Sequence, residues 1–266
     1  MHGNDSFGEN YLKNLQNHGV NTTFVKIINN SSGVAQIAVS NEESIIYDLL
    51  VQIYFLGENH IIIVAGANNE LNASDVLEAE GAIEKAKVVL FQFETPLSTT
   101  HKGLEICAKY SCISVVNGAP GLKNLNPEIL QLADIFCVNE TEAELITEFK
   151  IQNIVPDSMK AATKLVSMGC KLPIITLGDK GVVFTTKNAA QPIHIPVEHV
   201  SAVDTTGAGD AFIGGLAYFL AKYEHLSMET VIKKACEIAK FSVQKFGTQT
   251  SFPERKDVLT ILFVES

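Results

Sequence analysis

The fold is decided by one stretch of the sequence, Asp204-Thr205-Thr206-Gly207-Ala208-Gly209-Asp210-Ala211-Phe212. Gly207 and Gly209 let the backbone approach a ligand closely and turn successive N–H groups into one concavity. Behind this turn, apolar side chains recur at helical spacing: Phe212, Leu216, Phe219, Leu220 and Tyr223. The stretch therefore predicts a helix N-terminus that binds an anion, because the helix dipole favours negative charge at that end.

Asp210 is unexpected in such a turn, because a carboxylate repels the anion that the turn attracts. A catalytic role explains it: an aspartate beside a transferring phosphoryl group can accept the proton of the attacking hydroxyl. The backbone of Gly207, Ala208 and Gly209 would then stabilise the developing charge. The alternative is an ordinary helix start, with an acidic residue in the first turn and glycine in the preceding loop.

Three further segments accompany this stretch, namely Gly3-Asn4-Asp5-Ser6-Phe7-Gly8, Asn139-Glu140-Thr141-Glu142 and Phe246-Gly247-Thr248-Gln249-Thr250-Ser251. Together the four segments resemble the ribokinase (PfkB) family of carbohydrate kinases over nearly the whole chain. The resemblance implies one ribokinase-like kinase domain over residues 1–266, α/β in class, with three α/β/α layers, a mainly parallel central sheet and a small, incomplete β lid around residues 33–64. It also implies ATP-dependent phosphorylation of D-ribose to D-ribose 5-phosphate, with Asp210 as general base and Gly207–Asp210 as anion hole.

Composition is consistent with a single large core and argues against nucleic acid and membranes as partners. The 266 residues are 46% hydrophobic and 19% charged, and the net charge of −10 disfavours nucleic-acid binding. Five cysteines are scattered through apolar segments, as in proteins of reducing compartments. The N-terminus lacks a signal-peptide pattern, and the apolar stretch at residues 45–56 is too short to span a membrane. We therefore expect a cytoplasmic protein, with a nuclear location also open, and no membrane or nucleic-acid partner.

Strand-like and helix-like segments alternate from Val88 onward. The predicted buried strands are Val88–Phe93, Ile113–Val116, Ile135–Val138 and Ile174–Leu177. One intervening helix is expected to be capped by Asp157 or Ser158 and to run to Met168, with Gly169 just past its end. Alternation of this kind predicts a mainly parallel sheet with ligands at the carboxyl ends of its strands. Val34–Val39 and His60–Val64 lack a helix between them, and the resemblance implies that they belong to the lid.

The resemblance implies a nucleotide site and a magnesium site at the carboxyl ends of these strands. Nucleotide contacts are expected from Asn139, Thr176, Leu177, Gly178, Asp179, Lys180, Gly181, Gly209, Asp210 and Cys236. Glu142 is expected in the outer shell of magnesium, where a carboxylate can orient metal-bound waters. The alternatives are helix capping by Asn139 or Thr141 and, for residues 176–181, a turn between strands. Cys236 stands where the family often has an asparagine.

Sugar and monovalent-cation contacts are also implied by the resemblance. Glu94 ends a buried strand, where an ionised carboxylate needs solvent or a hydrogen-bonding ligand, and the resemblance makes that ligand the sugar. Ala35 matches a lid position that touches the sugar, although an ordinary strand residue is an alternative. A potassium site is implied at Asp204, Thr206, Ser242, Lys245, Gly247 and Ser251. A helix that ends near Gly247 is compatible with this site.

Two features depart from the family pattern. The family's first strand, with its sugar-binding aspartate, and a Gly-Gly-Lys-Gly-Ala-Asn segment do not occur in the sequence, and residues 43–56 resemble an insertion. We therefore expect reduced activity and a weakened homodimer through the lid, with ribose and ATP as the ligands. Two alternatives stay open: another PfkB-family sugar or nucleoside kinase, and a catalytically weak product that binds nucleotide or a full-length subunit.

Overall fold

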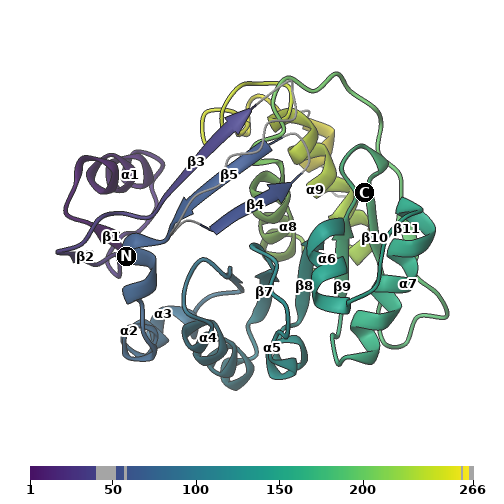
Figure 1. Ribbon diagram of the computed structural model, residues 1–266, viewed down its shortest axis with the longest axis horizontal. Helices are drawn as coiled ribbons and strands as arrows, with labels where there is room; N and C mark the ends of the chain where they lie inside the picture. The colour runs from purple at the N-terminus through teal and green to yellow at the C-terminus, as the bar shows by residue number, and fades with distance from the viewer. Residues whose placement is uncertain (40–51, 57–58, 259, 264–266) are drawn as a thin grey trace. The chain divides into compact units, whose positions relative to one another are not determined.

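The computed structural model describes the backbone of residues 1–39, 52–56, 59–258 and 260–263 (Figure 1). Internal contacts divide the chain into two compact units, Met1–Gly81 with Phe93–Gly103 and Ala82–Gln92 with Leu104–Ser266. The single kinase domain over residues 1–266 stays a prediction. None of the described helices combines the length and the apolar character needed to cross a bilayer.

The second unit is built on a six-stranded sheet. Its order is β11 (Ile193–Ile195), β10 (Val182–Phe184), β9 (Pro173–Thr176), β8 (Ile135–Asn139), β7 (Ile113–Asn117) and β6 (Val88–Phe91). Strands β6 to β9 run parallel, whereas β10 pairs antiparallel with both β9 and β11. The predicted mainly parallel sheet is confirmed. The predicted strand Val88–Phe93 ends two residues early, at Phe91.

Helices cover both faces of this sheet and make the three predicted layers. Figure 1 shows α6 and α7 on one face and α8 and α9 on the other. Ile135, Cys137 and Ile174 of the sheet pack with Phe212 and Leu216 of α8, and all five side chains are buried. The helices after β6 are α4 (Leu97–Tyr110), α5 (Pro127–Leu132), α6 (Glu140–Thr147), α7 (Ile154–Ser167), α8 (Ala208–Lys222) and α9 (Met228–Ser242), with the 3₁₀ turns η2 (Gly178–Lys180) and η3 (Thr260–Phe263).

The predicted start of one helix is wrong. Helix α7 begins at Ile154, with Asn153 as N-cap, rather than at Asp157 or Ser158. The Asp157 carboxylate lies inside the first turn and accepts the N–H groups of Gln152 and Asn153. An acidic side chain that reaches back to the helix start therefore resembled a cap in the sequence.

The first unit contains two small sheets. In one, β1 (His2–Gly3) pairs parallel with β2 (Ile27–Ile28), beside α1 (Ser6–Asn17). In the other, β5 (Asn59–Val64) lies between β3 (Val34–Val39) and β4 (Gln52–Leu56), and both pairings are antiparallel. The unit also holds η1 (Gly66–Glu70) and α2 (Ala73–Glu78), and its first segment ends at Gly81, within α3 (Glu80–Ile83).

The apparent insertion at residues 43–56 takes part in this second sheet. Its last five residues form β4 and pair with β5. Residues 43–51 lie outside the described residues. The segment therefore supplies an edge strand to the sheet that the sequence predicts as the lid, and closure of this sheet over a sugar stays a prediction.

Candidate active site

The turn before α8 has the backbone geometry of an anion-binding site. Gly207 is the N-cap of α8 and has φ +83°, in the left-handed region that favours glycine. A Cβ at Gly207 would lie 3.2 Å from atoms of Thr248 and Phe252, so this position is also sterically closed. A Cβ at Gly209 would meet no atom within 4 Å. The first N–H groups of a helix lack intrahelical acceptors, so those of Gly209 and Asp210 adjoin open space.

Asp210 is the third residue of α8. The residue is exposed to solvent. Protein atoms around its carboxyl group nevertheless displace part of the water, and this desolvation raises the pKa of Asp210 above its ordinary value. In the part of the chain that the structure describes, its carboxyl group has neither a hydrogen bond nor an ion pair. A carboxylate that is partly desolvated and unpaired, beside open N–H groups, is suited to accept a proton.

Asp204 joins the turn to the loop after α9. Its Oδ1 accepts the N–H of Thr206 and its Oδ2 accepts the N–H of Gly247, both at 2.9 Å. Hydrogen bonds, the side chain of Thr206 foremost, hold the pKa of Asp204 below its ordinary value. Asp204 is therefore ionised at neutral pH, and three of the residues predicted to hold potassium lie together.

The other predicted potassium ligands lie in the same loop region. The Ser242 carbonyl accepts the N–H of Lys245 at 3.2 Å, and Ser251 is fully buried. The N–H and the Oγ of Ser251 both donate to the Thr248 carbonyl. A carbonyl oxygen has two lone pairs, so one that accepts a hydrogen bond can also bind a cation. One carboxylate and several carbonyls form a donor set that fits a hard monovalent cation.

Asn139 and Glu142 form a reciprocal capping box at the start of α6. The Asn139 side chain accepts the N–H of Glu142 at 2.8 Å, and Glu142 Oε2 accepts the N–H of Asn139 at 2.9 Å. The predicted cap at Asn139 is confirmed, and Thr141 is not the cap. The hydrogen bond from the Asn139 N–H holds the Glu142 carboxylate at the carboxyl edge of the sheet. At this edge Asn139 pairs with Thr176 in register.

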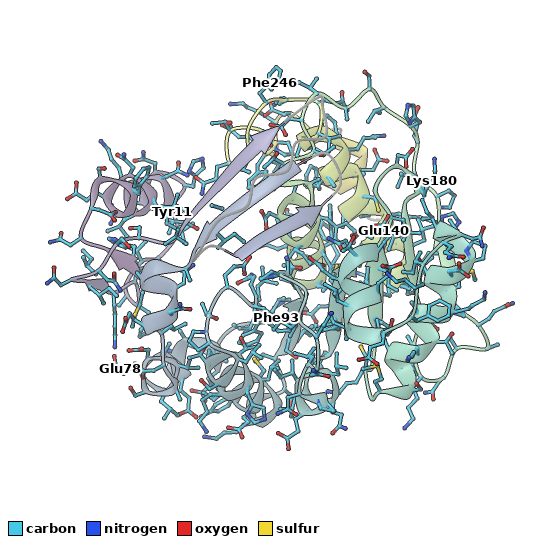
Figure 2. All side chains as sticks on the ribbon, in the orientation of Figure 1. Tyr11, Glu78, Phe93, Glu140, Lys180 and Phe246 are labelled. Atoms are coloured by element: carbon cyan, nitrogen blue, oxygen red, sulfur yellow. The ribbon has the colours of Figure 1, made fainter. Side chains whose placement is uncertain are left out.

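The acidic groups at this edge suit a hydrated cation, although no three His, Cys, Asp or Glu side chains of the described chain group together to bind a metal directly. Glu142 is buried and oriented by its hydrogen bond. Burial, with a smaller contribution from Asp179, raises the pKa of Glu140, the first residue of α6 (Figure 2). A single oriented carboxylate fits an outer-shell role at magnesium, because this ion keeps most of its waters.

A cavity of about 240 Å³ lies between the β9–β10 hairpin, the start of α8 and one face of α9. The predicted nucleotide contacts that line it are Thr176, Gly178, Asp179, Gly181, Gly209 and Cys236. Leu177 is buried in the core instead. The Lys180 side chain, labelled in Figure 2, pairs with Asp179 at 2.9 Å outside the cavity lining. Asn139 and Asp210 also lie outside the lining.

Sequence reasoning missed most of the cavity wall. The missed lining residues are Val182, Val197, Glu198, His199, Val200, Ala202, Thr205, Phe212, Ala239, Lys240 and Val243, whereas Ala208, predicted for the anion hole, also lines the cavity. The α9 members follow Cys236 at helical spacing, a signal present in the sequence beside the apolar face of the same helix. Residues 197–202 have no regular secondary structure, so no periodicity marked them.

Of the three predicted sugar contacts, Asp210 lies in the unit with the cavity, whereas Ala35 and Glu94 belong to the other unit. Ala35 is an exposed residue of β3 and pairs in register with Ile63 of β5. Glu94 is half-buried and lies in the loop that follows β6 and precedes α4 in the sequence. Contact of either residue with a sugar stays a prediction.

Comparison with known proteins agrees with these features. The profile of the pfkB family carbohydrate kinases matches residues 1–255. Ribokinase from Mus musculus is 40% identical over 262 residues, covering 98% of this chain and 76% of the mouse protein. Deoxyribokinase from Salmonella typhi is 36% identical over 253 residues, and the match covers 94% of this chain and 76% of the Salmonella protein.

Solved structures show the same relationship. The structure of Arabidopsis thaliana ribokinase complexed with ribose and ATP superposes with a TM-score of 0.81 at 27% identity. The match covers 99% of this chain and 80% of the Arabidopsis chain. The predicted ribokinase-like α/β fold is therefore confirmed, and the chain belongs to the pfkB family of carbohydrate kinases, enzymes that transfer phosphate to a sugar.

Proposed function

We propose that this protein catalyses the ATP-dependent phosphorylation of D-ribose to D-ribose 5-phosphate. The observation that carries the proposal is the position of Asp210: an unpaired, partly desolvated carboxylate in the first helical turn, beside the open N–H groups of Gly209 and Asp210. The 40% identity with mouse ribokinase supports ribose as the acceptor. Ribose and ATP are also the two ligands of the Arabidopsis ribokinase complex, which supports the same pair of substrates.

In the proposed reaction the Asp210 carboxylate accepts the proton of the primary sugar hydroxyl as its oxygen attacks the γ-phosphorus of ATP. The bond from that phosphorus to the bridging oxygen breaks, and ADP leaves. Negative charge develops on the transferring phosphoryl oxygens, and the open N–H groups of Gly209 and Asp210 would donate to them. The N–H of Ala208, also expected in the anion hole, donates to the Thr205 carbonyl at 3.2 Å and would have to leave it to take part. The raised pKa of Asp210 makes it a stronger proton acceptor than an ordinary aspartate.

The nucleotide is proposed to occupy the cavity beside α9, in contact with Thr176–Gly181 and Cys236, and with Asn139 near the phosphates. Glu142 would orient waters on magnesium, which neutralises charge on the β- and γ-phosphates when bound. Potassium would bind at Asp204 and the neighbouring carbonyls and stabilise the turn from Asp204 to Gly207. Glu94 and Ala35 are proposed sugar contacts. We also propose a homodimer through the β3-β5-β4 sheet and a cytoplasmic location, with the nucleus as a second one.

A second candidate is phosphorylation of 2-deoxyribose, which the 36% identity with Salmonella deoxyribokinase favours. Both sugars carry the same reacting hydroxyl and differ at the 2-position. Purified protein incubated with ATP and ribose, 2-deoxyribose or a nucleoside distinguishes these acceptors, with ³¹P NMR to identify the product. We expect the highest kcat/KM with ribose. A higher value with 2-deoxyribose would support the second candidate, and ATP binding without any sugar-dependent turnover would support a catalytically weak, nucleotide-binding product.

A further inference from the structure

One wall of the cavity has little backbone support. The wall segment, Pro196–Ala202, follows β11 and contributes Val197, Glu198, His199, Val200 and Ala202 to the lining. Its residues lie in no helix or strand and make no backbone–backbone hydrogen bond with another described residue. The remaining walls come from the β9–β10 hairpin and from α8 and α9, which have the backbone hydrogen bonds of regular strands and helices. Val197 packs against the hydrophobic core, so it is the polar part of the wall segment, from Glu198 onward, that needs another attachment.

Lys240 of α9 provides that attachment. Its Nζ lies 3.2 Å from Glu198 Oε2 of the wall segment and 2.6 Å from Glu237 Oε2 of its own helix. Glu237, then Glu198, keep the pKa of Lys240 above its ordinary value, so the ammonium group is charged at neutral pH. Within the described chain, the bond from Lys240 to Glu198 is the one hydrogen bond or salt bridge made by the wall segment. His199 of the segment adds a weaker electrostatic interaction with Asp179 of the hairpin, which contributes to the lowered pKa of Asp179.

We propose that Lys240 is a positioning residue of the cavity: by binding Glu198 it holds the wall segment against α9 and so increases affinity for the nucleotide. The inference rests on the proposed function in taking this cavity as the ATP site. A wall already held in place loses less conformational freedom when a ligand binds. The Glu198 side chain is 78% exposed and that of Lys240 only 18%, so water around Glu198 screens the attraction between the two charges. Exposed pairs of this kind alter an equilibrium by about two- to five-fold.

Four substitutions test the inference on the whole protein. Lys240→Met removes the charge but retains the length of the side chain, and Glu198→Gln removes the other partner. Glu237→Gln is the matched control, because it removes a carboxylate from Lys240 without removing the link to the wall segment. Lys240→Arg restores the charge. The measurements are hydrogen exchange of a peptide covering residues 196–203 without nucleotide, the Kd of ATP by titration calorimetry without sugar, and KM and kcat with ribose.

Lys240→Met and Glu198→Gln should each accelerate exchange in the wall segment and weaken ATP binding about two- to five-fold. The double variant should be no weaker than either single variant, because both remove the same link. The effect should fall on KM for ATP rather than on kcat. Glu237→Gln should stay near wild type in exchange and affinity, and Lys240→Arg should recover most of both.

Wild-type exchange or wild-type ATP affinity in Lys240→Met and Glu198→Gln would overturn the inference. Additive losses in the double variant, or an equal loss in Glu237→Gln, would also overturn it. Failure of the proposed function has a different signature. A wild-type protein that binds ATP but phosphorylates no sugar would contradict the ribokinase proposal, whereas the exchange and affinity comparisons would still decide the role of Lys240.

Discussion

Replacing Gly209 with alanine should separate stability from catalysis. Gly209 is the second residue of α8, and a methyl group there would meet no protein atom within 4 Å. Alanine restricts the unfolded chain more than glycine does and favours the helix by about 0.5–1 kcal/mol. The folded protein should therefore tolerate Gly209→Ala and melt up to about 4 °C higher.

The same methyl group should be harmful to phosphoryl transfer. It would project into the open space that we assign to the transferring phosphoryl group. If it moves that group away from the N–H donors, the loss resembles removal of an oxyanion donor, which lowers kcat by about 10²–10³-fold. Gly209→Ala should thus be more stable and much less active than the wild type.

Gly214 offers a matched control in the same helix. A Cβ at Gly214 also meets no atom within 4 Å, and Gly214 is absent from the cavity lining. Gly214→Ala should therefore gain stability and keep its activity. Thermal unfolding of the ligand-free variants and a coupled assay of ADP release with ribose measure both quantities. Near wild-type turnover in Gly209→Ala would refute the position assigned to the phosphoryl group. An equal loss of activity in both variants would show that the loss comes from a change in the helix rather than from the methyl group at the phosphoryl site.

Three further predictions concern the same turn. Gly207→Ala should lower the free energy of unfolding by about 1–2 kcal/mol, measured by urea unfolding, because φ is +83° and Thr248 and Phe252 crowd the added Cβ; unchanged stability would contradict this. Replacing potassium with tetramethylammonium at matched ionic strength should reduce kcat, and equal rates would exclude a role for a cation at Asp204. The raised pKa of Asp210 destabilises the fold once pH rises past the ordinary aspartate value, so Asp210→Asn should raise the melting temperature at pH 7 but not at pH 3. A lower melting temperature at pH 7 would show that the ionised carboxylate is stabilising.

Local patterns predicted the elements that carry the proposed chemistry. The helix after the glycine turn starts at Ala208, as the spacing from Phe212 to Tyr223 indicated, and the strand at Val182–Phe184 begins directly after the predicted loop. The capping box at Asn139 could be predicted from the sequence because its two partners are three residues apart. Interactions of this range leave a signal in the order of residues.

Longer-range features could not be read in this way. Glu198 and Lys240 are 42 residues apart, and the wall segment between β11 and Val203 has no periodicity that marks it as part of a cavity. The pairing of residues 52–56 with β5 was hidden too, because the segment resembled an insertion rather than a strand of the sheet. Each of these depends on tertiary packing rather than on local propensity.

The role of Asp210 as the base is tested most directly by the rate of phosphoryl transfer in Asp210→Asn, measured in a single turnover with ribose and compared with the Kd of ATP for the same variant. The substitution keeps the size of the side chain and removes the proton acceptor. We predict a rate about 10²–10⁴-fold below wild type with nearly unchanged ATP affinity. A rate within a few-fold of wild type would show that Asp210 is not the base and would contradict the proposed mechanism.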